Sequence, residues 1–193
     1  MPRLKSFDEK EVLTKAMNLF WTKGYSATSI QDLVTHLGIN RASLYNTFGD
    51  KDQLFKMSFD LYRISTIEQV SQLFSRNDQV KQGLAELFYG AIEDVDTDRD
   101  SKGCFFVNTI TEMVPNDMSL MNAFEVVKAD FINLFFQYLK KGKETGQLQT
   151  QHDLKSLATF LFVVYNGLKV VSKVNSDKTN VSESVTLALT LVV

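Results

Sequence analysis

The stretch at residues 24–51, GYSATSIQDLVTHLGINRASLYNTFGDK, predicts two short helices joined by a tight turn. Gly38 and Gly49 each follow a helix-like run and are typical helix stops. Only residues 38–40 separate the two runs. A glycine-containing turn this short, between helices of one to two turns, is typical of a helix-turn-helix.

Polar residues stand where each of these helices should begin. Thr28 followed by Gln31 has the spacing of a capping box, in which two side chains satisfy the free amides of the first turn. Asn40 marks the next start, and Asp50 with Gln53 opens a third helix. The second helix of the pair therefore covers residues 41–48.

The preceding segment predicts a helix at about residues 7–23. Ser6 with Glu9 has capping-box spacing, and Gly24 ends the run. Apolar residues recur at three- and four-residue spacing in these first helices, so we expect one small shared core. The expected core positions are Val12, Ala16, Leu19, Phe20, Ile30, Leu33, Val34, Leu37, Leu44 and Phe48.

The rest of the chain also has helical periodicity, with few breaks. A long helix from residue 51 is apolar on more than one side, so we expect it to pack on both the first three helices and the remainder. The fold class is therefore all-α, with about nine helices. The further helices are expected at 51–76, 79–95, 103–114, 117–142, 153–174 and 181–193.

Composition sets the broad class. The chain has 193 residues, 44% apolar and 23% charged, which is ordinary for a globular protein with a substantial core. No run approaches the roughly 20 apolar residues that cross a bilayer, and the N-terminus lacks an apolar signal core. One cysteine excludes an internal disulfide framework. We expect a cytoplasmic protein without membrane contact.

Charge is distributed unevenly, although the net value is only −2. Residues 1–51 contain seven Lys or Arg and five Asp or Glu, whereas the remainder contains 14 and 18. A mildly basic N-terminal part with an acidic remainder permits contact with nucleic acid through a local face. It does not establish that contact.

The helix at residues 41–48 has the side chains that reading DNA requires. A helix in the major groove needs base-reading groups near its N-terminus and small or polar residues on its outer face. Arg41 is suited to a guanine and Asn46 to an adenine, with Ser43 between them. The alternative is that these three are ordinary solvated helix residues.

Phosphate contacts would fix the register of such a helix. Thr28 and Ser29 stand at a helix N-terminus, where hydroxyls and free amides suit an anionic oxygen. Tyr45 follows the core residue Leu44 and can present its hydroxyl to a phosphate, and Lys51 at the next helix start can do likewise.

This region resembles the N-terminal domain of TetR-family transcriptional regulators. The resemblance covers the first quarter to third of the chain and supports the phosphate-contact roles of Tyr45 and Lys51. It implies a DNA-binding domain at residues 1–50 and an effector-binding and dimerisation domain at residues 51–193. The matching residues are Gly24-Tyr25, Thr28-Ser29-Ile30, Leu33, Leu37-Gly38-Ile39, Leu44-Tyr45, Phe48, Lys51 and Leu54-Phe55.

The resemblance also implies a dimer on double-stranded DNA. Two-fold dimers place two recognition helices about 34–36 Å apart on one face of the duplex. The last two predicted helices are strongly apolar for the end of a chain, and by resemblance they form a four-helix contact with a partner subunit. The alternative is burial within the same subunit, and both can hold for different residues.

A sensor of this family further implies a cavity for a small, largely apolar effector, bounded by the helix that starts at residue 51. Binding would shift that helix and change the spacing of the recognition helices. Twelve of the fifteen phenylalanines lie beyond residue 51, and core packing is the alternative role for each. The candidate wall residues are Tyr62, Phe88, Phe105, Asn108, Thr109, Glu112, Phe131, Phe135 and Tyr165.

Cys104 is a candidate redox or electrophile sensor. It follows Lys102-Gly103 at a predicted helix start, and both a cation and a helix N-terminus make a thiol more reactive. The run Gly103-Cys104-Phe105 resembles a subgroup of TetR regulators that includes cysteine sensors. The alternative is an inert buried cysteine.

Other classes of function have less support. The sequence has no nucleophile elbow, phosphate-binding loop, metal-ligand cluster or cysteine–histidine pair, so we expect no enzyme activity, cofactor or metal. A helical module that binds protein through its helix-turn-helix remains the alternative to a DNA-binding repressor. Such a module would show no steep salt dependence with DNA.

Overall fold

The computed structural model describes residues 7–97, 102–113, 121–174 and 178–192, and these residues form nine α-helices and no strand. The predicted all-α class is therefore confirmed. The helices are α1 (Glu9–Lys23), α2 (Ile30–Leu37), α3 (Arg41–Phe48), α4 (Lys51–Arg76), α5 (Val80–Thr97), α6 (Phe105–Met113), α7 (Met121–Glu144), α8 (Leu154–Val171) and α9 (Lys178–Thr190).

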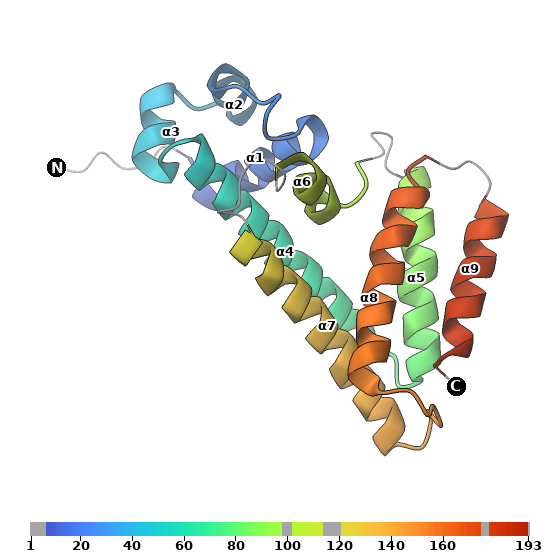
Figure 1. Cartoon of the computed structure of the whole chain (residues 1–193). Coiled ribbons are helices and arrows are strands. Elements are labelled where there is room, and N and C mark those ends of the chain that lie inside the picture. Colours follow the sequence, from blue (N-terminus) through green and yellow to red (C-terminus); the bar gives the residue numbers. More distant parts are fainter. Residues whose placement is uncertain (1–6, 98–101, 114–120, 175–177, 193) are drawn as a thin grey trace.

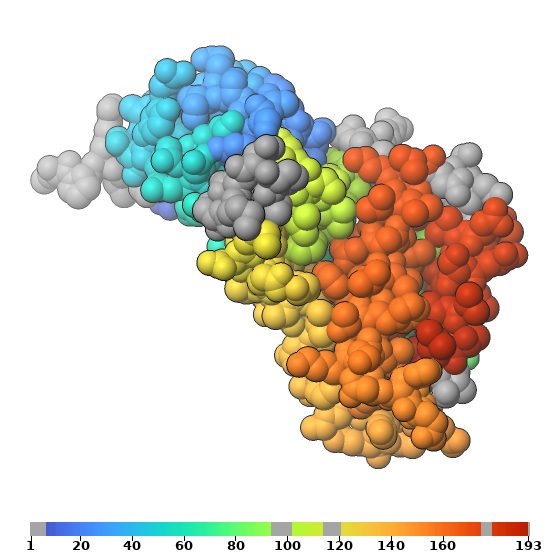
Figure 2. All heavy atoms as spheres, in the orientation of Figure 1, coloured from blue at the N-terminus to red at the C-terminus, as the bar shows by residue number. Residues whose placement is uncertain are grey.

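Helices α1–α3 form a head at one end of the long helix α4, and α5, α7, α8 and α9 form a body along the rest of it (Figure 1). The short helix α6 lies between head and body. In the space-filling view the head projects from the body as a separate lobe (Figure 2). One face of the head is thus open to a partner.

Helix α4 joins the two parts through aromatic packing at both ends. Near its start, the Phe55 ring packs edge-on against Phe20 of α1, with ring centres 5.2 Å apart. Near its end, Phe74 stacks on Tyr138 of α7 at 4.0 Å. Such ring pairs add to the free energy gained by burial alone. The prediction that α4 packs on both parts is confirmed.

The helix starts in the head are capped, although two caps differ from the prediction. Asp8, not Ser6, accepts the first-turn amides of α1, and Ser6 lies outside the described residues. The capping box of α2 is Ser29 with Asp32. It lies one residue beyond the predicted pair because the Thr28 hydroxyl donates to the carbonyl of Gly24 instead (2.6 Å).

The other predicted caps are confirmed. Asn40 Oδ1 accepts the amide of Ser43, and Asp50 Oδ1 accepts that of Gln53, each at 2.8 Å. Gly38 adopts a left-handed conformation (φ 68°), which a residue with a Cβ enters at a cost. The turn between α2 and α3 is therefore fixed by local chemistry.

Helix α8 corrects the expectation that no segment could span a bilayer. Within the described residues, the segment Leu154–Val174 reaches a mean hydropathy of 1.4 over a membrane-spanning length. Core helices pass the same test, and α8 packs on α7, α5 and α9. However, only 39% of its apolar window is buried, so much of its apolar surface faces outward.

Candidate nucleic-acid interface and internal cavity

Helix α3 lies on the outside of the head. Leu44 and Phe48 turn inward, with 0% and 3% of their surface exposed. Arg41 and Asn46 are exposed, and Tyr45 keeps 45% of its surface accessible. This is the arrangement predicted for a helix that enters a groove of DNA.

The remaining base-reading candidate, Ser43, is half-buried, and its amide is held by the Asn40 cap. The backbone at the start of α3 is thereby fixed, so that Arg41 projects from an ordered first turn. That these side chains read bases remains a prediction.

The start of α2 has a fixed polar arrangement. The Ser29 amide and hydroxyl both donate to Asp32 Oδ2, at 2.8 and 2.6 Å, and Lys23 lies 2.7 Å from the same oxygen. These partners, with Lys23 first, hold the pKa of Asp32 well below its ordinary value. Ser29 is exposed, so a phosphate can still approach this corner of the head.

Thr28 is a correction to the predicted phosphate contacts. Its side chain is fully buried, its hydroxyl donates to the Gly24 carbonyl, and its amide donates to Tyr25. A group that is buried and hydrogen-bonded in this way cannot also reach a phosphate. Thr28 instead closes the loop between α1 and α2.

Lys51 is also engaged inside the head. Its Nζ donates to the carbonyls of Tyr25 and Thr28, each at 3.0 Å, and lies 4.0 Å from the centre of the Tyr25 ring. Two carbonyls and an aromatic face satisfy much of what an ammonium group requires. The predicted phosphate contact is not what this geometry shows, because the charge is directed inward onto the loop.

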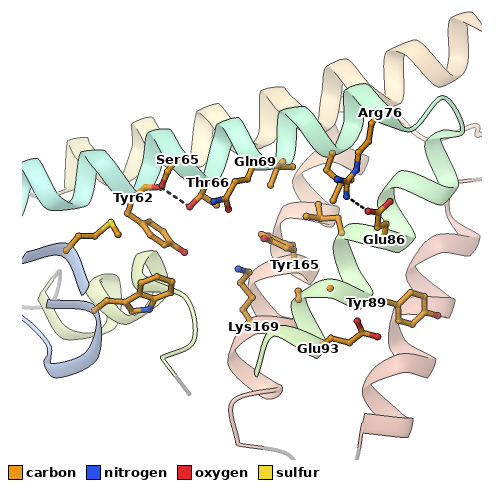
Figure 3. Close-up of a pocket in the computed structure, with 17 residues that line it drawn as sticks. Tyr62, Ser65, Thr66, Gln69, Arg76, Glu86, Tyr89, Glu93, Tyr165 and Lys169 are labelled. Atoms are coloured by element: carbon orange, nitrogen blue, oxygen red, sulfur yellow. Dashed lines mark hydrogen bonds and ion pairs between the residues drawn. The ribbon is translucent and has the colours of Figure 1, made fainter. Parts of the chain in front are cut away.

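A cavity of about 630 Å³ lies between α4, α5 and α8 and reaches α1 (Figure 3). Of the predicted wall residues, it includes Tyr62 and Tyr165. Its lining consists of Met17, Trp21, Tyr62, Ser65, Thr66, Gln69, Val70, Leu73, Arg76, Glu86, Leu87, Tyr89, Gly90, Ala91, Glu93, Tyr165 and Lys169.

The other predicted wall residues lie elsewhere. Phe88, Phe131 and Phe135 are buried in the aromatic core of the body, where ring-to-ring packing leaves them no free face toward this cavity. Phe105, Asn108, Thr109 and Glu112 line a separate cavity of about 310 Å³ between the end of α1 and α6. Periodicity marks the inner face of a helix but cannot distinguish packing from lining.

The cavity wall is polar on the α4 side. Ser65, Thr66 and Gln69 line the cavity from neighbouring positions on α4 (Figure 3). The Ser65 and Thr66 hydroxyls donate to the carbonyl of Tyr62, at 3.0 and 2.8 Å. These three residues were not among the predicted wall residues. Their signal in the sequence was weak, because α4 carries polar and charged residues along its whole length.

Aromatic and charged groups form the rest of the wall. Trp21 packs edge-on against Tyr62 at 5.1 Å, and its Nε1 donates to the carbonyl of Gly103 (3.1 Å). Across the cavity, Lys169 lies 5.0 Å from the centre of the Tyr165 ring. Arg76 and Glu86 form an ion pair at the end of α4 (Figure 3). The wall can therefore contact flat apolar groups and polar groups together.

Cys104 lies behind this wall. It is 6% exposed, and its Sγ is 3.5 Å from the hydroxyl of Tyr62. Burial, followed by the neighbouring thiol, raises the pKa of Tyr62 well above its ordinary value. The sulfur is therefore buried and in contact with a residue of the cavity wall.

Apolar side chains are exposed on the outer surface of α8 and α9 and just after α8. Val163, Leu187 and Val174 are 61%, 70% and 84% exposed. Exposed apolar side chains that cluster on adjacent helices are typical of a protein contact surface. Phe160, Val170, Val171 and Leu191 are also exposed on these two helices or directly after them.

No group of three or more His, Cys, Asp or Glu suited to a metal ion occurs in the described residues. The features that stand out are a helix-turn-helix with an open outer helix and a cavity in an all-helical body. Together they define a DNA-binding regulator whose helical body holds a cavity.

Comparison with known proteins agrees with this class. Residues 12–57 match the family model for bacterial regulatory proteins of the tetR family, and residues 81–187 match the tetracyclin repressor-like C-terminal domain. The chain therefore belongs to the TetR family, whose members are regulators and not enzymes. It is a DNA-binding transcriptional repressor of that family, which removes the alternative of a module that does not bind DNA.

Individual relatives extend along nearly the whole chain. The HTH-type transcriptional regulator YezE of Bacillus subtilis (strain 168) is 30% identical over 192 residues, which cover 99% of both chains. The repressor ComR of Escherichia coli (strain K12) is 32% identical over 89% of this chain and 82% of its own. A cysteine mutant of the regulator CifR, complexed with 26-base-pair operator DNA, superposes with a TM-score of 0.85 at 27% identity, covering 97% of this chain and 98% of its own.

Proposed function

We propose that the chain is a homodimeric, ligand-responsive repressor whose residues 1–50 bind DNA and whose residues 51–193 bind the effector and the partner subunit. The observation that carries the proposal is the cavity of about 630 Å³, because its wall includes residues of both parts. Met17 and Trp21 belong to α1 of the head, whereas Tyr165 and Lys169 belong to α8 of the body. Such a regulator acts on DNA in the cytoplasm.

The proposed DNA contacts are on α3 and at the start of α2. Arg41, Ser43 and Asn46 face bases, whereas Tyr45 and the Ser29 corner face phosphates. The exposure of Arg41, Tyr45 and Asn46 supports these roles. Lys51 contributes indirectly, since it holds the loop that precedes α2.

The proposed dimer forms through α8 and α9. A four-helix contact would cover Val163 and Leu187, which are more than half exposed in one subunit. This contact also accounts for the apolar character of α8 without a membrane. It would hold two heads at a fixed separation, which two half-sites on one duplex require.

The effector that the cavity fits is amphipathic rather than largely apolar. Hydroxyl and amide groups of α4 face aromatic rings of α1 and α8 across the space (Figure 3). An aromatic ring that carries a hydroxyl or amide group can contact both walls. In our proposal, a ligand that packs on Trp21 alters the contact between α1 and α4 and so moves the head.

Trp21 is the sole tryptophan of the chain, so its fluorescence reports the cavity directly. We would screen uncharged aromatic alcohols and amides for quenching of Trp21, and for release of a duplex from upstream of the gene. Gly90→Phe should abolish both responses, because Gly90 lines the cavity and a Cβ there meets nothing within 4 Å. Gln82→Phe, on the exposed side of α5, is the matched control. Compounds that release the duplex equally from Gly90→Phe would contradict the site.

Cys104 gives a second candidate trigger, because the Tyr62 hydroxyl that it touches also faces the cavity. Oxidation or alkylation of the thiol would displace Tyr62 and deform the same wall. A thiol reagent applied to the native protein tests this candidate. Labelling that appears only after denaturation would eliminate it, as the burial of Cys104 leads us to expect.

A further inference from the structure

The loop between α1 and α2 is attached to α6 by a carboxylate. Glu112, near the end of α6, accepts the amide of Tyr25 on Oε2 at 3.1 Å and the amide of Ser26 on Oε1 at 2.7 Å. These residues are 87 and 86 positions away in the sequence. Hydrogen bonds to an ionised carboxylate are about twice as strong as those between neutral groups.

The same loop is held from its other side by α4. The Nζ of Lys51 donates to the carbonyls of Tyr25 and Thr28. The loop thus has its amides bound by an anion from α6 and its carbonyls bound by a cation from α4. A six-residue connection, residues 24–29, that would otherwise be a mobile surface loop becomes a fixed part of the head.

The close approach of Glu112 also explains the glycine that precedes these amides. A Cβ built at Gly24 would lie 2.9 Å from Glu112 Oε2, closer than ordinary contact. Gly24 also has a φ of 85°, which favours glycine. Glycine at position 24 therefore leaves room for the Glu112 carboxylate to reach the loop amides.

Helix α6 lies between head and body and also packs on the body, so Glu112 links the body to the head. Phe106 packs against Phe124 of α7 and Phe162 of α8, at 5.9 and 6.3 Å. At the start of α6, the Gly103 carbonyl accepts Trp21 Nε1, so α6 is tied to the head at both ends. The loop ends at Ser29, which is the N-cap of α2. The position of α2 therefore depends on the position of α6.

We infer that Glu112 is a positioning residue for DNA binding, although it lies in the second part of the chain and faces the loop rather than DNA. Glu112 fixes the conformation of the loop, and the loop fixes the position at which α2 starts. Helices α2 and α3 then move together as one unit. The inference goes beyond the proposed function, because it needs neither an effector nor its release. It rests on DNA binding alone.

The test is the DNA affinity of Glu112→Gln, and the sign of the effect is decisive. The amide of glutamine keeps the size of the side chain but offers one acceptor oxygen in place of two. Removal of a negative charge by itself favours binding to a polyanion. Loss of the loop contact opposes binding, and we expect affinity for a duplex selected from a random pool to fall by about five- to tenfold.

Glu125→Gln is the matched control, since Glu125 is an exposed carboxylate of α7 that pairs with Lys128. It should bind the duplex as tightly as the native chain or more tightly. Equal or tighter binding by Glu112→Gln would overturn the inference.

A readout on the native chain covers the case in which that variant fails to fold. The amides of Tyr25 and Ser26 should exchange with solvent far more slowly than the amide of exposed Ala27, and equal exchange rates would also overturn the inference.

Discussion

The head and the cavity wall differ in how fully their polar side chains are bound by neighbours. In the head, the polar groups at the helix starts and in the α1–α2 loop are bound by neighbouring side chains, such as the Ser29–Asp32 box and the Lys51 ammonium on two carbonyls. In the body, the side chains of Gln69 and Glu93 project into open space within the wall. The head therefore behaves as one preformed unit, whereas the cavity wall can exchange water for a ligand at low cost.

This difference suits the two roles that we propose, since DNA binding and effector binding place different demands on the two regions. A fixed recognition unit pays little ordering entropy when it binds. The side chains of a partly open cavity wall can change their packing without disrupting the hydrophobic core of the body. Trp21 and Glu112 lie at the boundary between these regions, where the head is hydrogen-bonded to α6 and the residue that precedes its first turn.

The largest expected effect is the loss of DNA affinity when the proposed dimer contact is disrupted. Val163→Glu with Leu187→Glu should yield a monomer with an intact fold, because both side chains are exposed in one subunit. Loss of two-site binding should weaken DNA affinity by about 100-fold or more. Sedimentation and duplex titration measure the two quantities. Gln137→Glu, exposed on α7, adds charge elsewhere and should leave a dimer, and monomeric behaviour there would contradict the interface.

The second prediction compares one chemical change in the two regions. Leu44→Ala in the sealed core of the head should lower the free energy of unfolding by about 2–5 kcal/mol. Leu73→Ala should cost about 1–2 kcal/mol, because Leu73 already borders the cavity and loses fewer contacts. Urea unfolding measures both. Equal losses would show that the cavity wall is packed as tightly as the head.

The third prediction tests whether Lys51 holds the α1–α2 loop or contacts a DNA phosphate. Lys51→Met should lower stability and weaken DNA binding for all sequences, because the α1–α2 loop loses its clamp. The slope of log affinity against log salt should stay unchanged. A lysine that contacts phosphate would instead lower that slope by about 0.9 on removal. Arg41→Ala provides the contrast, since it should relax sequence preference.

The smallest expected effect concerns pH. The folded state lowers the pKa of Asp32, so the unfolded chain binds this proton more readily. The stability from Asp32 is therefore complete above its ordinary value of 3.8 and is lost as the pH falls below it. Asp32→Asn should be less stable than the native chain at neutral pH, and the difference should shrink in acid. Glu68→Gln, exposed on α4, should show no such pH-dependent difference.

The head could be predicted from sequence because its signals are local. The glycine at 38, the caps at Asn40 and Asp50 and the apolar spacing of Leu44 and Phe48 each act within four residues. The errors there were also local, as when the α2 cap moved by one residue to Ser29.

The cavity could be predicted only in part because its wall combines helices that are distant in sequence. Tyr62 and Tyr165 were predicted to line it and do so, but Phe88 and Phe135, which have the same periodicity, fill the core. Lys51 and Glu112 had plausible roles by type, yet their partners are backbone atoms of a loop that the sequence does not place. Tertiary contacts of this kind have no local signature.

The most direct test of the account is a pair of Trp21 quenching titrations with one cavity ligand from the screen, in the absence and presence of saturating duplex. Coupling between sites is reciprocal, so duplex must weaken the ligand by the same factor by which the ligand weakens duplex binding. We predict a higher ligand midpoint when the duplex is bound. Coincident titrations from a ligand that quenches Trp21 would show that the cavity and the recognition helix are independent, and would contradict the account.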